Sequence, residues 1–107
     1  MITFEDFDKI EFKTAKIIEA NRVEGSEKLI VLILDLAGEK RQIVAGIGKT
    51  YNPEDLIGKI IIIVANLEPK TLMGIESNGM LLAAHDSEGN PVILIPEKEV
   101  ESGGRIT

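Results

Sequence analysis

Cysteine and tryptophan are absent from this chain, and histidine occurs once, as His85. Without cysteine the chain forms neither disulfide bonds nor thiolate zinc sites, and one histidine does not support a histidine metal site or a Ser-His-Asp triad. No fully apolar run is longer than that of residues 60–65, which is far shorter than the roughly 20 residues that span a membrane. The acidic first 20 residues lack the apolar core of a signal peptide. We therefore expect a cytoplasmic protein with no metal and no cofactor.

The net charge of −6 comes from the two ends of the chain. Residues 28–84 hold six basic and six acidic side chains and are neutral as a whole. The acidic ends disfavour non-specific binding to polyanions. A neutral centre can still present a local basic face, which would bind RNA through few phosphate contacts.

At 107 residues the chain is expected to be one domain, residues 1–107, and the pattern is mostly that of strands. The expected strands are 12–23, 29–36, 40–45, 59–66, 80–84 and 92–95, with an irregular acidic tail from residue 96. A helical turn is expected at 52–58, because Asn52 can cap it, Pro53 suits its first position and Gly58 follows its end.

A short N-terminal helix is expected at 4–9, since Thr3 and Asp6 have the spacing of a capping box. Phe4 and Phe7 fall on one face of this helix and need a cover. Packing on the chain's own barrel and a contact with a second copy both satisfy this need. The pair is therefore a candidate dimer interface.

Short strands with a helical turn between the third and fourth predict an all-β OB-fold, a five-stranded Greek-key barrel. That fold binds oligonucleotides on the face of strands two and three and on the loops that join strands one to two and four to five. In this chain those loops are 24–28 and 67–79. The second loop is longer than the 2–5 residues that a simple chain reversal needs, which favours a binding role.

Several side chains in and beside these loops are candidates for RNA contact, and each has a structural alternative. Lys28 closes the first loop and could be an ordinary surface lysine. Arg41 on the third strand could form a cross-strand ion pair with Asp35 or Glu39. Asn66 could cap a turn with its own side chain.

The second loop offers further candidates. Lys70 could meet a phosphate or be solvated, and residues 77–79 could form a β-turn or present Ser77 and Asn78 to splayed bases. Met80 could be core or an apolar shelf, and Met73 in mid-loop suits stacking. Tyr51, the one aromatic residue of the middle, is a second stacking candidate, although packing beside Pro53 is favoured.

No catalytic constellation stands out. Residues 46–50 end in Gly-Lys-Thr, but Ile43 occupies the position where a P-loop requires its first glycine, and no long helix follows. His85, at a strand end, is expected to be structural or incidental. The chain is therefore not expected to be an enzyme.

Three segments together carry a family resemblance: VEGSEKL at 23–29, RQIVAGI at 41–47, and VANL with GIESNGMLLAA within 64–84. They resemble the tRNA-binding domain of the β subunit or C-terminal part of methionyl-tRNA synthetases. The same domain occurs in endothelial-monocyte-activating-polypeptide-type cofactors and in a free-standing structure-specific tRNA-binding protein.

This resemblance implies an OB-fold, a homodimer and recognition of tRNA shape around the elbow. Carried over by position, the contact residues would be Lys28, Arg41, Asn66, Ser77, Asn78 and Met80, to which Lys70 is added. Two departures matter, because members often have glutamine at position 78 and lysine at position 68. Glu68 removes a positive charge from the RNA face, which Lys70 can offset.

Because the chain starts with Met1 and carries no catalytic domain, it is expected to be a stand-alone β subunit that raises the tRNA affinity of a separate catalytic chain. A secretion-chaperone branch shares the fold but differs at 41–47 and 77–80. A peptide-binding chaperone is therefore the alternative function.

Overall fold

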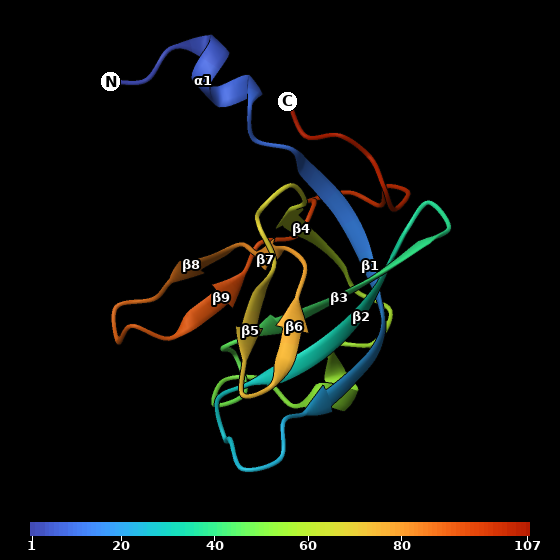
Figure 1. The fold of residues 1–107 in the computed structure, drawn as a ribbon, viewed down its shortest axis with the longest axis vertical. Helices are drawn as coiled ribbons and strands as arrows, with labels where there is room; N and C mark the ends of the chain where they lie inside the picture. The colour runs from blue at the N-terminus through green and yellow to red at the C-terminus, as the bar shows by residue number, and fades with distance from the viewer.

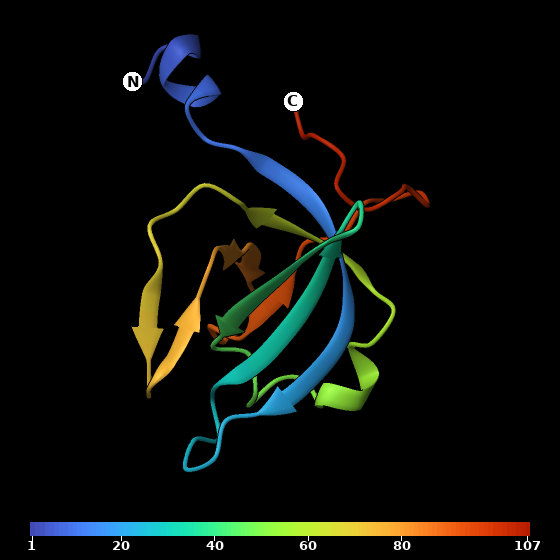
Figure 2. The same cartoon turned by 45° about the vertical axis from the view of Figure 1, so that its right-hand side comes forward.

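A curled, five-stranded antiparallel sheet forms the centre of the computed structural model, which describes all residues 1–107 (Figure 1, Figure 2). The strand order is β3-β2-β1-β4-β7. Its strands are β1 (Phe12–Arg22), β2 (Ile30–Leu36), β3 (Glu39–Ala45), β4 (Ile60–Val64) and β7 (Met80–Leu81). The other elements are helix α1 (Phe4–Asp8), the 3₁₀ turn η1 (Pro53–Asp55) and two hairpins, β5 (Lys70–Leu72) with β6 (Ile75–Ser77) and β8 (Ala83–His85) with β9 (Pro91–Ile93). The predicted OB-like all-β fold, with a helical turn between β3 and β4, is confirmed.

The curl of the sheet depends on β1, which pairs with two partners along its length. Its first half pairs with β4 and its second half with β2, and the register shifts between Ile17 and Glu19. Such a bulge bends a strand and increases its twist. On β2, every second residue from Ile30 to Leu36 is buried, so one face of this strand supplies the core.

Tyr51 belongs to this core rather than to a binding surface. Its ring packs against the buried cluster, and its hydroxyl accepts a hydrogen bond of 3.1 Å from the backbone N–H of Ile93. The phenol thus joins the segment after β3 to β9. It is not a free stacking platform.

The segment expected to be a binding loop without strands, 67–79, instead contains the β5–β6 hairpin. Met73 (φ 48°) and Gly74 (φ 79°) form its two-residue turn, both in the left-handed region that suits the twist of a hairpin. The expected single strand 80–84 is also two elements, because β7 pairs with β4 while β8 pairs with β9.

The acidic tail is bound to the start of β1. The backbone N–H of Gly103 donates to the carbonyl of Thr14 (2.7 Å), and that of Ile106 donates to the carbonyl of Phe12 (3.1 Å). Both termini consequently lie at one end of the molecule, away from the β1–β2 loop (Figures 1 and 2). None of the helices has the length and apolar character needed to cross a membrane.

Candidate nucleic-acid interface

The β5–β6 hairpin is attached to β3 through Ser77. This side chain is only 4% exposed, and its Oγ accepts from the N–H of Val44 (2.9 Å) and donates to the carbonyl of Gly79 (3.1 Å). The Gln42 carboxamide strengthens the joint by donating to the carbonyl of Glu76 (2.9 Å). The Ser77 hydroxyl therefore uses its only donor inside the protein, and its burial leaves little access for RNA to the remaining acceptor lone pair.

The tip of the same hairpin reaches the β1–β2 loop. A Cβ atom placed on Gly25 would lie 3.6 Å from the Cε of Met73, which is an ordinary van der Waals distance. The two loops expected to bind RNA, 24–28 and 67–79, thus meet in space. Met73 remains more than half exposed at this junction.

Lys28 extends from the first loop over the end of β3. A Cβ on Gly46 would lie only 2.9 Å from the Cε of Lys28, so the missing side chain of Gly46 leaves room for the lysine stem. Lys28 is exposed and forms no ion pair. Its ammonium group is free to meet a phosphate.

Two hollows lie beside the hairpin and share the side chain of Leu67. The first, here called the apolar hollow, has a volume of about 490 Å³. It is lined by Val44, Leu67, Glu68, Lys70, Leu72, Ser77, Gly79 and Met80. The second, the polar hollow, has a volume of about 310 Å³ and is lined by Lys40, Arg41, Gln42, Ala65, Leu67 and Asn78. A further hollow is lined by both Met80 and Gly46, the glycine that the Lys28 stem contacts.

Arg41 is largely committed to the protein. Its Nε and Nη2 donate to the Glu39 carboxylate at 3.0 and 2.8 Å, and its Nη1 donates to the carbonyl of Ala65. The ion pair that was the alternative for Arg41 exists, but it joins neighbours on β3 and does not cross between strands. Lys40 also lines the polar hollow and forms no ion pair, and as the preceding residue of β3 it points to the opposite face of the strand from Arg41.

Asn66 faces away from both hollows. Its Oδ1 accepts from the N–H of Glu11 (2.9 Å), and its Nδ2 donates to the carbonyl of Lys9 (2.7 Å). The side chain therefore fastens the N-terminal segment to the end of β4. Asn66 does not cap a turn with its side chain, which was the structural alternative predicted for it.

The N-terminal helix leaves an apolar surface uncovered. Phe7 lies between Phe4 and Phe12, with ring centroids 6.3 and 5.6 Å apart, and Phe4 is 78% exposed. The predicted capping box of Thr3 and Asp6 is present, and the hydrogen bond from the Thr3 backbone N–H lowers the pKa of the Asp6 carboxyl. Phe7 thus packs against Phe12 at the start of β1, while Phe4 contacts the Phe7 ring but stays largely exposed.

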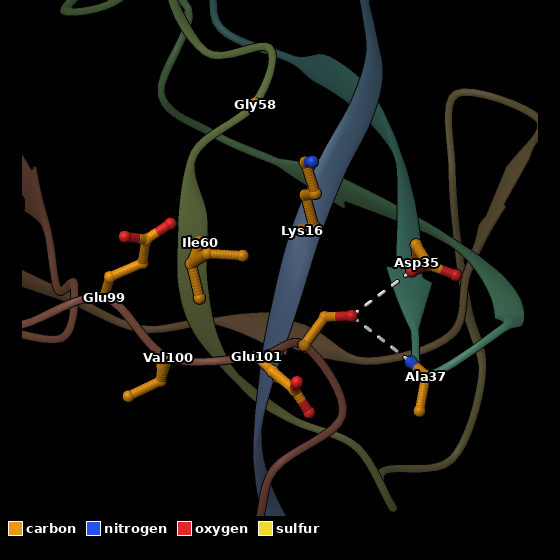
Figure 3. A pocket seen from close by; sticks show the side chains of 9 residues that line it. Lys16, Asp35, Ala37, Gly58, Ile60, Glu99, Val100 and Glu101 are labelled. Atoms are coloured by element: carbon orange, nitrogen blue, oxygen red, sulfur yellow. Dashed lines mark hydrogen bonds between the residues drawn. The ribbon is translucent and has the colours of Figure 1, made fainter.

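A separate hollow lies between β1, the end of β2 and the tail (Figure 3). Lys16 is its only cation, beside the carboxylates of Asp35, Glu99 and Glu101. The Ser102 hydroxyl donates to Asp35 (3.2 Å) and accepts from the N–H of Ala37 (3.3 Å), so this region fastens the tail to the β2–β3 turn. Its excess of carboxylates disfavours phosphate.

The structure therefore places Arg41, Lys70, Asn78 and Met80 at adjoining hollows, with Ser77 buried in the lining and Lys28 nearby over Gly46, and it places Asn66 elsewhere. Lys40, Leu67 and Leu72 also line these hollows but were not selected from the sequence. Leu67 had a usable signal, since it is a large apolar residue at the start of a polar segment. Lys40 had none beyond its position next to Arg41.

Comparison with known sequences assigns the chain to a family. The family model described as "Putative tRNA binding domain" matches residues 12–105. The methionine–tRNA ligase of Caldanaerobacter subterraneus subsp. tengcongensis is 58% identical over 106 residues, which are 99% of this chain and 16% of that protein. The chain thus spans about a sixth of the length of this curated relative.

Two solved structures resemble the whole chain. A MetRS-related protein from Pyrococcus horikoshii has a TM-score of 0.94 and 36% identity, with 100% of this chain and 98% of that chain covered. The chaperone CsaA from Bacillus anthracis str. Ames has a TM-score of 0.91 and 34% identity, with 100% and 99% covered. The chain belongs to the tRNA-binding domain family and is related to the methionyl-tRNA synthetases.

Proposed function

We propose that this chain binds folded tRNA through the surface formed by the β1–β2 loop, β3 and the β5–β6 hairpin. The observation that carries the proposal is the meeting of the two loops, with Met73 against Gly25 and the stem of Lys28 over Gly46. Free cations, amides and exposed apolar side chains together form the kind of surface that binds RNA backbone and unstacked bases. The family membership supports this assignment.

The side chains divide into contacting and supporting residues. Lys28 and Lys70 are exposed cations suited to phosphates, and Met80, 48% exposed, is an apolar shelf. Asn78 can offer its carboxamide to the RNA. Ser77, by contrast, supports the surface by joining the hairpin to β3.

Arg41 shapes the polar hollow from within, because its guanidinium is bonded to Glu39 and the Ala65 carbonyl. Asn66 acts from outside the surface by holding the N-terminal segment. In this proposal both residues affect tRNA binding through the fold.

The chain would act as the non-catalytic β subunit of a methionyl-tRNA synthetase. It would hold tRNA near a separate catalytic chain and so raise the effective tRNA concentration there. A homodimer formed through the α1 surface would double the RNA-binding surface. Phe4, exposed beside Phe7, is the residue that most needs such a cover.

A peptide-binding chaperone is the second candidate function. The likeness to CsaA and the apolar hollow, lined by Val44, Leu67, Leu72 and Met80, favour it. The two functions differ in salt dependence, since RNA binding weakens as salt rises while apolar peptide binding does not.

A titration with folded tRNA, duplex RNA and unstructured single-stranded RNA at two salt concentrations tests the proposal. We expect salt-sensitive binding that prefers folded tRNA. Equal and weak binding of all three would reject the tRNA function and direct attention to peptides. The dimer is tested separately by the mass in solution at micromolar concentration, where a monomer would refute it and where Phe4→Ser should yield monomers.

A further inference from the structure

We propose that the apolar and polar hollows together bind one unpaired nucleotide of the RNA, and that Glu68 selects guanine as its base. This inference rests on the proposed tRNA-binding function. It assigns a role to the carboxylate that is otherwise unfavourable on an RNA surface.

The apolar hollow has the size and lining for a nucleobase. Its volume of about 490 Å³ falls within the range of small-ligand pockets. Leu67 and Met80 are 46% and 48% exposed there, so a flat ring would cover apolar surface that water now contacts. The thioether of Met80 is polarizable and suits contact with an aromatic face.

The polar hollow is placed to take the phosphate of the same nucleotide. Leu67 forms a wall of both hollows, so a base on one side of it has its backbone near the other. Lys40 lines this hollow and forms no ion pair, whereas the charge of Arg41 is paired with Glu39. The Asn78 carboxamide has no partner within the chain and can bond a phosphate or ribose oxygen.

Glu68 lies at the apolar hollow, where it would meet an edge of the bound base. An ionised carboxylate only accepts hydrogen bonds and is repelled by the carbonyl oxygens of bases. Guanine presents two adjacent donors, N1–H and the N2 amino group, on its Watson–Crick edge, which matches the two carboxylate oxygens. Adenine, cytosine and uracil each have only one donor group on that edge, so none of them can satisfy both carboxylate oxygens. The carboxylate therefore favours guanine over the other three bases.

Methyl NMR of the three methionines tests this inference, because Met1, Met73 and Met80 give one signal each. The probes are RNA hairpins with a uridine loop in which one loop base is G, A, C, U or inosine. We expect the guanine hairpin to shift the Met80 methyl by ring current and to bind roughly 5-fold tighter or more than the adenine hairpin, as for a good bidentate base contact. Inosine, which lacks the N2 amino group, should bind with intermediate affinity.

Glu68→Gln should abolish the preference for guanine while the chain stays folded, because residue 68 is exposed. The control is Glu88→Gln in the β8–β9 turn, which makes the same charge change outside the hollows and should leave the preference intact. Folded tRNA is titrated in parallel with each variant.

The outcomes separate the two proposals. If tRNA binds but no hairpin shifts the Met80 methyl, the nucleotide site is refuted and the tRNA function stands. If all five hairpins shift it equally, or if Glu68→Gln keeps the preference, the selection of guanine is refuted. If neither tRNA nor any hairpin binds, the proposed function itself fails.

Discussion

Ser77→Ala tests whether the candidate surface depends on a buried joint. The change removes the acceptor of the Val44 N–H and the donor to the Gly79 carbonyl. Val44 is itself buried, so its N–H would lose its partner without gaining water. Leaving one buried donor unsatisfied costs about 1–3 kcal/mol. Total stabilities of small domains are about 5–15 kcal/mol, so the variant should still fold.

Urea unfolding at constant protein concentration measures this loss, and hydrogen exchange at the Val44 amide locates it. In thermal unfolding, the melting temperature should fall by about 4 °C or more for each kcal/mol lost. In a titration, the affinity for tRNA should fall because the hairpin is less firmly held on β3. Ser87→Ala, in an exposed turn, is the matched control and should change stability by less than about 0.5 kcal/mol. If the two variants are equally stable, the Ser77 hydroxyl does not hold β3, and the assignment of a supporting role is wrong.

Three further changes test other parts of the molecule. Asn66→Ala should free the N-terminal segment, with faster hydrogen exchange at its backbone and a loss of about 0.5–1.5 kcal/mol, and unchanged exchange would contradict the tether. Thr3→Ala should raise the pKa of Asp6, measured by NMR titration, towards its ordinary value of 3.8, since the cap that favours the carboxylate is weakened. Because the pKa of Asp6 is lowered in the folded chain, the cap stabilises the helix at pH values above the ordinary pKa of this carboxyl. The stabilisation is lost as the pH falls through the lowered pKa. Lys28→Ala should weaken tRNA binding and reduce its salt slope by about one unit, whereas Lys98→Ala in the tail should change neither.

Most strands were predictable because their residues carry a local signal. The alternation of burial on β2 and the isoleucine run of β4 follow directly from side-chain pattern and β-branching. The β5–β6 hairpin was missed for a physical reason. Its strands are three residues long, and its turn places Met73 in a left-handed conformation that methionine seldom adopts.

The sequence predicted which residue types lie at the candidate surface, but it did not predict their hydrogen-bond partners. The role of Ser77 depends on Val44, 33 residues away in the sequence, and that of Asn66 depends on backbone groups more than 50 residues away. Local pattern carries no information about such distant pairs. An ion pair of Arg41 with Glu39 was one of the predicted alternatives, but it was expected to cross between strands. In the structure both residues lie on β3.

The position of the two termini has a practical consequence. Both leave the barrel at the end away from the β1–β2 loop (Figures 1 and 2). A dye, an affinity tag or a sensor surface attached through either end should therefore leave Lys28 and the hairpin tip accessible. The same orientation lets the module be immobilised by one terminus without blocking the approach of a large nucleic acid.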